Sequence, residues 1–367
     1  MNLFPDVKEH YSKDNVPAKF AQRYAEFIAF GPMIFQASRV AVKTGLLEAI
    51  HSSDNGLTIE EAAKATGLSI YGAKVLMEAA LSIGTLIVDP ETDKFSLSKT
   101  GWFLLNDPAT KVNMDFNHDV NYIGLFKLDE AIKEGRPAGL EHFGSWPTIY
   151  EGLSSLPPQV QKSWFGFDHF YSDNSFEEAL DVVFSYHPDR IMDVGGNTGR
   201  WAEKCVAHDP AVKVTIVDLP QQIKMMKDAT AGKEGADRID GRGTNLLDEK
   251  NAFPDDVHPD IIWMSQFLDC FSEEEIASIL SRAVKIMDKN TRLCIMETFW
   301  DRQRFEPGAF CLTMTSLYFT ALANGNSKMY HSDDMIRIIR NCGMEIEAIH
   351  DYLGTGGHSI LVCKKSI

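Results

Sequence analysis

The sequence that decides the fold reads Arg190-Ile191-Met192-Asp193-Val194-Gly195-Gly196-Asn197-Thr198-Gly199-Arg200-Trp201. It predicts a buried strand, a glycine turn and the start of a helix, which is how an open α/β sheet presents backbone N–H groups to a charged small molecule. Twenty-five residues after Asp193, the predicted strand Val214–Val217 ends in Asp218. An acidic side chain there can accept hydrogen bonds from both hydroxyls of a ribose. The two motifs together predict a nucleoside site.

The spacing of the glycines in this turn distinguishes a dinucleotide from other nucleoside ligands. A dinucleotide site requires glycine at three positions of G-x-G-x-x-G, but counting from Gly195 places Asn197 and Arg200 at the second and third of them. The pattern that the chain does meet is an acidic residue followed by G-x-x-x-G, with Asp193, Gly195 and Gly199. A carboxylate at the turn would repel a pyrophosphate and attract an amino group. The arrangement therefore favours S-adenosylmethionine, which carries an ammonium, a sulfonium and a ribose.

The composition narrows the class of protein. At 367 residues the chain is long enough for about two domains. Its formal charge of −16 argues against a nucleic-acid or anionic-membrane partner, because both require a basic surface. The six cysteines are widely spaced and show no metal-ligand pattern, so we expect reduced thiols and no metal site. No signal peptide and no apolar run of membrane-spanning length is evident, which favours a cytoplasmic protein.

The N-terminal part predicts a helical domain, residues 1–108. Apolar residues recur at helical spacing from Ala18 to Ile50, with a break at Gly31-Pro32. A capping box at Thr58 and two further helical segments precede a hairpin at 86–97, which together indicate a winged helix–turn–helix. Such units usually bind DNA, but the second helix carries only Lys74 and Glu78 as charges. We therefore expect a packing or dimerisation role.

Two further domains are expected. Residues 109–185 are helical and rich in aromatics, and they predict a connector and pocket wall. From residue 186 strands alternate with helices, which predicts a Rossmann-like α/β domain, 186–367, with a mostly parallel sheet. The expected strands are 190–194, 213–217, 260–264, 292–297, 345–351 and 358–363. No helix separates the last two, so we expect one of them to be antiparallel.

The order of these parts resembles the S-adenosylmethionine-dependent small-molecule O-methyltransferases, whose members include hydroxyindole and plant phenolic methyltransferases. The resemblance covers roughly residues 20–363 and rests on three segments in the N-terminal half and two in the C-terminal half. The first three are Thr44-Gly45-Leu46-Leu47-Glu48-Ala49-Ile50, Leu57-Thr58-Ile59-Glu60-Glu61-Ala62-Ala63 and Phe95-Ser96-Leu97-Ser98, and the other two are the glycine turn and Val217-Asp218-Leu219-Pro220. It implies a winged-helix dimerisation domain, a homodimer and a small-molecule acceptor.

The resemblance also implies site residues. The family's adenine-side motif corresponds to Thr244-Asn245-Leu246-Leu247. Ser265 stands at the position of the lysine that meets the methionine carboxylate, and Gln266 at that of the adenine-stacking aromatic. The expected cofactor residues are therefore Asp193, Gly195, Gly196, Asp218, Leu219, Asn245, Leu246, Ser265 and Gln266.

The catalytic positions depart from the family pattern. Where typical members have a His-Asp pair with histidine as general base, this chain has Asp269 and Cys270, whereas the supporting acid matches Glu297. An Asp of ordinary pKa is a poor base for a phenol, but burial or a neighbouring Glu297 could raise it. The other candidate bases are His118, His169 and His331, the last of which belongs to Tyr330-His331 in place of the family's Arg-Thr pair. Trp164, Asp168 and His331 are candidates for the substrate pocket.

Three hypotheses follow. The first is a methyltransferase that acts on a small, partly aromatic acceptor, with Asp269 and Glu297 facing that acceptor. The second keeps the cofactor but performs a non-methylating reaction, such as decarboxylation or hydroxylation, because the catalytic histidine is missing. The third is a ligand-sensing DNA-binding protein, against which the acidic composition argues.

Overall fold

The computed structural model describes residues 11–366, which form two compact units, 11–119 and 120–366. Each unit is considered by itself. The first is largely helical, and its elements are α2 Ala18–Ala29, α3 Gly31–Lys43, α4 Leu46–His51, α5 Ile59–Thr66, α6 Ile70–Ile83, β1 Leu86–Val88, β2 Phe95–Leu97, α7 Lys99–Asn106 and α8 Pro108–Phe116.

Local signals in the sequence explain these boundaries. The predicted capping box is present, because the Thr58 hydroxyl accepts from the Glu61 N–H while the Glu61 carboxylate accepts from the Thr58 N–H. Ser69 caps α6 through the Gly72 N–H, and Gly84 ends that helix with φ of 91°. Strands β1 and β2 form the expected antiparallel hairpin. Apolar side chains of α3 to α6 and of the hairpin form the core of this unit.

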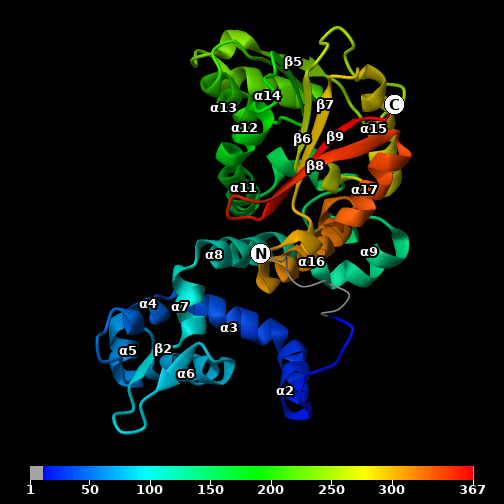
Figure 1. Cartoon of the computed structure of the whole chain (residues 1–367). Coiled ribbons are helices and arrows are strands. Elements are labelled where there is room, and N and C mark those ends of the chain that lie inside the picture. Colours follow the sequence, from blue (N-terminus) through cyan, green and yellow to red (C-terminus); the bar gives the residue numbers. More distant parts are fainter. Residues whose placement is uncertain (1–10, 367) are drawn as a thin grey trace. The chain divides into compact units, whose positions relative to one another are not determined.

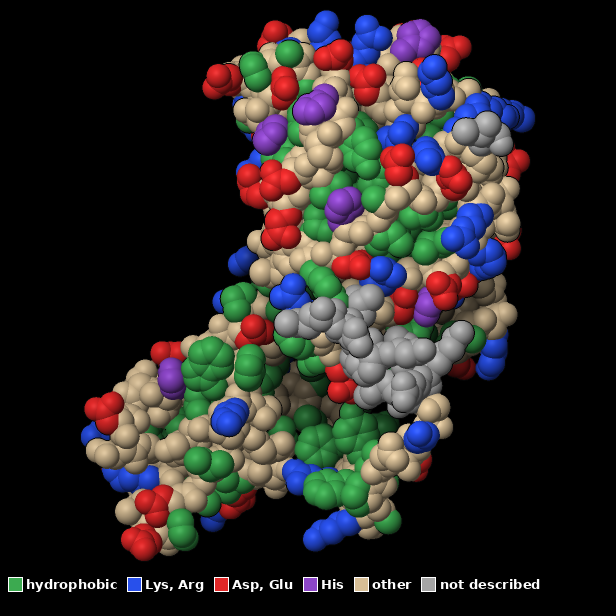
Figure 2. Space-filling model, viewed as in Figure 1, with side chains coloured by type: hydrophobic (Ala, Val, Ile, Leu, Met, Phe, Trp, Pro, Cys, Tyr) green, Lys and Arg blue, Asp and Glu red, His purple; other side chains and the backbone are tan. Residues whose placement is uncertain are grey.

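One helix of this unit buries none of its side chains. Helix α2 has no buried residue, and Phe20, Tyr24 and Ile28 are 63%, 66% and 71% exposed. Their spacing of four residues places them on one helical face. Figure 2 shows hydrophobic side chains at the surface over α2. Such a stripe is typical of a surface that packs against another protein.

The second unit is an α/β domain preceded by helices. Its helices and turns are η2 Gly124–Lys127, α9 Leu128–Glu134, η3 Ala138–His142, α10 Ile149–Gly152, η4 Leu153–Ser155, α11 Pro158–Ser172, η5 Asp173–Ser175, α12 Phe176–Phe184, α13 Arg200–His208, α14 Pro220–Thr230, η6 Ala236–Arg238, η7 Leu268–Cys270, α15 Glu273–Ile286, η8 Trp300–Arg302, α16 Glu306–Tyr318, η9 Phe319–Ala323 and α17 Ser332–Asn341. A short segment, η1 Asn117–Asn121, joins the two units in sequence.

The seven strands are β3 Arg190–Val194, β4 Lys213–Asp218, β5 Ile239–Gly243, β6 Ile261–Ser265, β7 Arg292–Glu297, β8 Met344–Leu353 and β9 His358–Lys365. They lie in the order β5-β4-β3-β6-β7-β9-β8, in which β9 is antiparallel to both neighbours. The expected fold class, a mostly parallel sheet with an antiparallel last strand, is confirmed. Strand β5 was not expected, nor was α16.

Helices cover both faces of this sheet, as Figure 1 shows. Apolar side chains of α12, α13 and α14 pack on one face, and those of α15 and α17 pack on the other. Strand residues alternate between the two cores, so Met192 and Val194 join one while Ile191 joins the other. Because Asp193 is two residues after Ile191, its side chain lies on the same sheet face, the one that α13 covers. The carboxyl ends of β3, β4, β6 and β7 meet at one edge of the sheet, where ligands bind in folds of this kind.

Candidate functional site

The glycine turn after β3 packs too closely for larger residues. A Cβ atom on Gly196 would lie 2.4 Å from Asp193 Oδ2, and one on Gly195 would lie 2.4 Å from the Phe267 ring. Gly195 and Gly199 also have positive φ, 76° and 86°, which glycine adopts without strain. The turn is therefore a close-fitting loop that ends at the N-terminus of α13.

Asp193 is buried beneath this turn. It is 2% exposed, and its Oδ2 atom makes no hydrogen bond within the described residues. Burial, followed by the charge of Asp218, raises the pKa of the Asp193 carboxyl to about 8. An orphaned buried acceptor is costly unless a donor satisfies it. The site is thus suited to a ligand group that donates hydrogen bonds or carries positive charge.

Asp218 is held rigidly at the end of β4. Its Oδ2 accepts from the Asn197 N–H at 2.9 Å, and its Oδ1 accepts from the Leu219 N–H at 2.7 Å. Burial is the largest cause of its raised pKa, and these two N–H groups oppose the rise. Each oxygen keeps a second lone pair, so the carboxylate can still accept from the two hydroxyls of a ribose.

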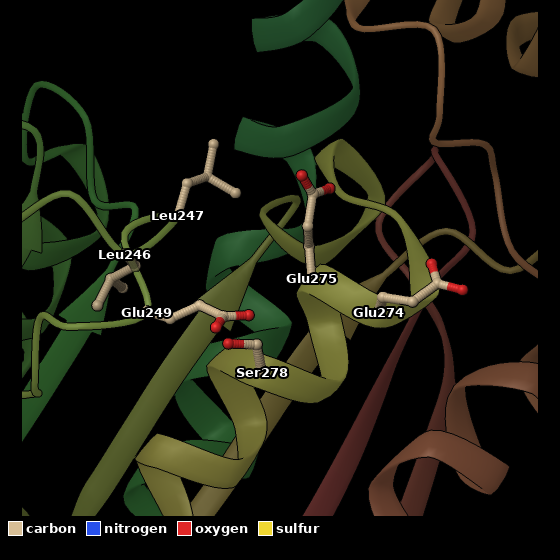
Figure 3. Close-up of a pocket in the computed structure, with 6 residues that line it drawn as sticks. All are labelled: Leu246, Leu247, Glu249, Glu274, Glu275 and Ser278. Atoms are coloured by element: carbon tan, nitrogen blue, oxygen red, sulfur yellow. The ribbon is translucent and has the colours of Figure 1, made fainter. Parts of the chain in front are cut away.

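The loop after β5 carries the expected adenine-side residues. Asn245 Oδ1 accepts from the Leu247 N–H at 3.0 Å, so its side chain stabilises a turn. Leu246 is buried and, together with Leu247, borders a pocket of about 80 Å³ between this loop and the first turns of α15, as Figure 3 shows. The remaining lining residues are Glu249, Glu274, Glu275 and Ser278.

Ser265 and Gln266 lie where β6 ends. Ser265 is the last residue of the strand, and Gln266 follows it with a positive φ of 46°. Gln266 also keeps a side-chain oxygen, Oε1, that is buried and makes no hydrogen bond within the described chain. A residue other than glycine in this backbone region is uncommon and often marks a functional site.

Two buried carboxyls lie just beyond these residues. Glu297, at the end of β7, is 2% exposed, and its Oε1 accepts from the N–H groups of Phe267 and Leu268 at 3.1 and 2.9 Å. Its Oε2 makes no hydrogen bond within the described residues. Asp269, in η7, is 6% exposed, and its Oδ1 accepts from the Cys270 thiol at 3.5 Å. The structure thus brings together the two residues expected to be catalytic.

Both carboxyls of this pair have a raised pKa. Burial raises the pKa of Asp269 to about 6. Burial, followed by the charge of Asp269, raises the pKa of Glu297 well above its usual range. Two neighbouring carboxylates cannot both ionise cheaply. The two carboxyls therefore resist ionising together, and the pKa of each is raised.

Side chains from three helices lie within reach of the Asp269 charge. The charge of Asp269 helps to raise the pKa values of Tyr150 in α10, Asp168 in α11 and Tyr318 in α16. Trp164 Nε1 donates to the Tyr318 hydroxyl at 2.7 Å. Trp164 and Asp168 therefore belong with the expected catalytic pair. Sequence reasoning missed Tyr318, because it lies in the unexpected helix α16.

The three candidate histidines lie in or next to three different elements. His331 is the N-cap of α17, accepts from the Asp333 N–H at 3.1 Å and packs edge-on against Trp300. His118 belongs to the N-terminal unit and lies 2.7 Å from Asp119. His169 lies on α11, where burial lowers its pKa. The described contacts of His169 and His331 include neither Asp269 nor Glu297.

Comparison with known protein families gives two matches to this chain. An O-methyltransferase domain model matches residues 175–343, and a Dimerisation2-like domain model matches residues 22–95. Residues 175–343 therefore form an O-methyltransferase domain. The dimerisation match covers the expected dimerisation domain, and the methyltransferase match contains the glycine turn, Asp218, Asp269 and Glu297.

Individual relatives are distant but span most of the chain. Human acetylserotonin O-methyltransferase is 21% identical over 308 residues, covering 81% of this chain and 85% of the relative. Bacteriochlorophyllide d C-20 methyltransferase of Chlorobaculum tepidum is 22% identical and covers 77% and 80%. Among solved structures, the S-adenosylmethionine-dependent methyltransferase SibL in its apo form matches with a TM-score of 0.71 and 20% identity, covering 93% of this chain and 98% of that one. These likenesses support the fold.

Proposed function

We propose that this chain transfers the methyl group of S-adenosylmethionine to a hydroxyl oxygen of a small aromatic acceptor. The observation that carries the proposal is the buried pair Asp269 and Glu297 at the sheet edge, close to the glycine turn and near the aromatic side chains of Tyr150 and Tyr318. The family match supports the reaction, and the name of the human relative supports an aromatic acceptor. No observation favours the non-methylating alternative.

The proposed cofactor residues fit this molecule. The orphaned Asp193 Oδ2 would accept from its ammonium, and the fixed Asp218 carboxylate would accept from its ribose hydroxyls. The other proposed contacts are Gly195, Gly196, Leu219, Asn245, Leu246, Ser265 and Gln266. When bound, S-adenosylmethionine supplies a methyl group activated by its positively charged sulfur.

The chain then has to orient the acceptor and accept one proton. During the transfer, an oxygen of Asp269 would accept the proton that the acceptor hydroxyl loses. A base with a pKa of about 6 is a better match to a phenol than an ordinary Asp. Glu297 keeps Asp269 in place through the backbone of Phe267 and Leu268.

Calorimetric titration tests the cofactor site. The native chain is expected to bind S-adenosylmethionine and S-adenosylhomocysteine, and Asp218→Ala is expected to weaken both by about tenfold or more, because two charge-assisted hydrogen bonds are lost. Asp228→Ala, which removes an exposed carboxylate from α14, is the matched control and is expected to bind normally. Absence of binding by the native chain would reduce the proposal to a statement about fold.

The reaction is tested with a panel of phenols, amines and carboxylic acids. Formation of methyl ether together with an equal amount of S-adenosylhomocysteine is expected for at least one phenol. Tight cofactor binding without methylated product from any compound would contradict the proposal.

We also propose a homodimer that forms through the N-terminal unit, and a cytoplasmic location. The exposed stripe of Phe20, Tyr24 and Ile28 and the Dimerisation2-like match support the first. All six cysteines are free thiols, which supports a reducing compartment. Within residues 11–366, no helix is both long and apolar enough to cross a bilayer.

A further inference from the structure

One face of α11 points toward the proposed acceptor site. Trp164 and Asp168 are four residues apart on this helix, so their side chains lie on the same face. The Trp164 indole is fixed by its 2.7 Å hydrogen bond to the Tyr318 hydroxyl of α16. Asp168 interacts electrostatically with both Tyr318 and Asp269. Asp168 therefore shares a helical face with Trp164 and lies near enough to the proposed base for the charge of Asp269 to raise its pKa.

This region contains more negative than positive charge. No lysine or arginine among the described residues forms an ion pair with Asp168, Asp269 or Glu297, and the nearby Arg200 pairs with Asp173. Burial of an ionised carboxyl without a neighbouring cation is costly. A ligand that brings positive charge would offset that cost.

We propose that the acceptor carries a positively charged nitrogen in addition to its reacting hydroxyl, and that Asp168 binds this nitrogen beside the Trp164 ring. The inference rests on the proposed function. A carboxylate next to an indole face is suited to an ammonium, because it combines charge attraction with a cation–π contact. With the ammonium at Asp168, the hydroxyl end of the acceptor can lie at Asp269.

The cofactor offers a second source of positive charge, its sulfonium. The cofactor has carboxyls of its own at the sheet edge, because Asp193 and Asp218 flank the glycine turn. Asp168 instead shares a helical face with Trp164, whose hydrogen bond leads to α16. We therefore assign Asp168 to the acceptor, and the experiment separates the two sources.

Ammonium binding at Asp168 should release a proton near neutral pH. Burial, followed by the charges of Asp269 and Asp173, raises the pKa of Asp168 to about 7, while Arg200 opposes the rise. A bound cation favours the ionised carboxyl. Part of the Asp168 population must therefore lose its proton when an amine binds at pH 6.5.

The test uses three phenols of similar shape. Tyramine carries an ammonium, 4-ethylphenol is neutral, and 3-(4-hydroxyphenyl)propionate carries a carboxylate. Binding to the full chain saturated with S-adenosylhomocysteine is measured by calorimetry at pH 6.5, in two buffers of different ionisation enthalpy. Tyramine is expected to bind about tenfold more tightly than 4-ethylphenol and to release protons, whereas the carboxylate is expected to bind more weakly than either.

Variants assign the effect to Asp168. In Asp168→Asn the ratio of tyramine to 4-ethylphenol affinity is expected to fall to within about threefold, and the proton release is expected to disappear. Asp181→Asn, which neutralises an exposed carboxyl on α12, is the matched control and is expected to keep both. Unchanged selectivity in Asp168→Asn, or equal binding of the first two phenols to the native chain, would overturn the inference.

Two further outcomes separate this inference from the proposed function. If Asp168→Asn weakens S-adenosylmethionine relative to S-adenosylhomocysteine and leaves phenol selectivity intact, Asp168 serves the cofactor sulfonium and the inference is wrong. Selective tyramine binding without any methylated product would support the inference, while contradicting the proposed reaction.

Discussion

Asp269 is the residue on which the proposed chemistry depends. Its pKa of about 6 results from burial. Asp269 and Glu297 were both named from the sequence, but their raised pKa values depend on the burial of both groups.

The pH dependence of turnover tests this residue. Because Asp269 must be ionised to accept a proton, kcat/KM for a methylated phenol is expected to rise with pH through about 6 and then level off. Asp269→Asn is expected to lower kcat by about 10²-fold or more and to abolish that rise, since a general base contributes on this scale. The control is Asp255→Asn, which removes an exposed carboxyl. A variant that keeps native kcat would show that another group takes the proton.

Asp193 links cofactor binding to stability. Its folded-state pKa of about 8 is higher than the usual value of 3.8, so the folded chain holds a proton that the unfolded chain has released. This contribution to the free energy of unfolding is complete below pH 4 and is lost as pH rises through about 8. The native chain should therefore lose up to about 1.4 kcal/mol per pH unit from this group between pH 5 and 7.

Asp193→Asn isolates this contribution, because asparagine stays neutral throughout. Denaturant unfolding of both chains from pH 5 to 7 without cofactor is the measurement, and the variant is expected to show the shallower decline. Parallel pH dependences would mean that Asp193 is not buried as a protonated group.

At the scale of the elements, the residues at strand ends could be predicted from the sequence. The expected strand positions of Asp193, Asp218 and Glu297 agree with the structure, because each lies at or next to the end of a strand with a clear apolar pattern. Strand β5 was missed because Ile239-Asp240-Gly241-Arg242-Gly243 contains a single large apolar residue and two glycines. It lies at the edge of the sheet, where β-propensity is a weak guide.

The sequence named Trp164 and Asp168 as pocket candidates, but it could not predict where they lie relative to the sheet. Asp168 and Trp164 lie in a helical connector, whose position relative to the sheet depends on side-chain packing that no local pattern encodes. Tyr318 completes their network from 154 residues further along the chain. Only the three-dimensional structure brings these residues to Asp269.

A capping box opens α15 directly after η7, the segment that carries Asp269. The Ser272 hydroxyl accepts from the Glu275 N–H, and the Glu275 carboxylate accepts from the Ser272 N–H. Loss of such a cap costs about 1 kcal/mol. Ser272→Ala is therefore expected to speed amide exchange in the first turn of α15 by about fivefold, as measured by hydrogen exchange. Lys285→Ala, in the last turn, is expected to leave those amides unchanged. Equal protection in Ser272→Ala would show that tertiary contacts alone hold the turn.

At the scale of the whole molecule, the exposed apolar face of α2 requires an explanation. A helix that buries none of its own side chains gains little from folding alone, because most helical stability in proteins comes from packing of an apolar face. A second copy of the chain that covers Phe20, Tyr24 and Ile28 would supply that packing. Stability would then depend on protein concentration, since association favours the folded state by mass action.

Sedimentation equilibrium at micromolar concentration is the measurement for this scale. The native chain is expected to be a dimer, and the double variant Tyr24→Glu, Ile28→Glu is expected to shift to monomer, because four buried charges per dimer would face one another across an apolar contact. Glu26→Gln changes an exposed residue of the same helix and is expected to remain dimeric.

The thermal midpoint of unfolding should rise with protein concentration for the native chain and not for the double variant. A native monomer would leave the α2 stripe to another partner, whereas a dimeric double variant would place the interface elsewhere.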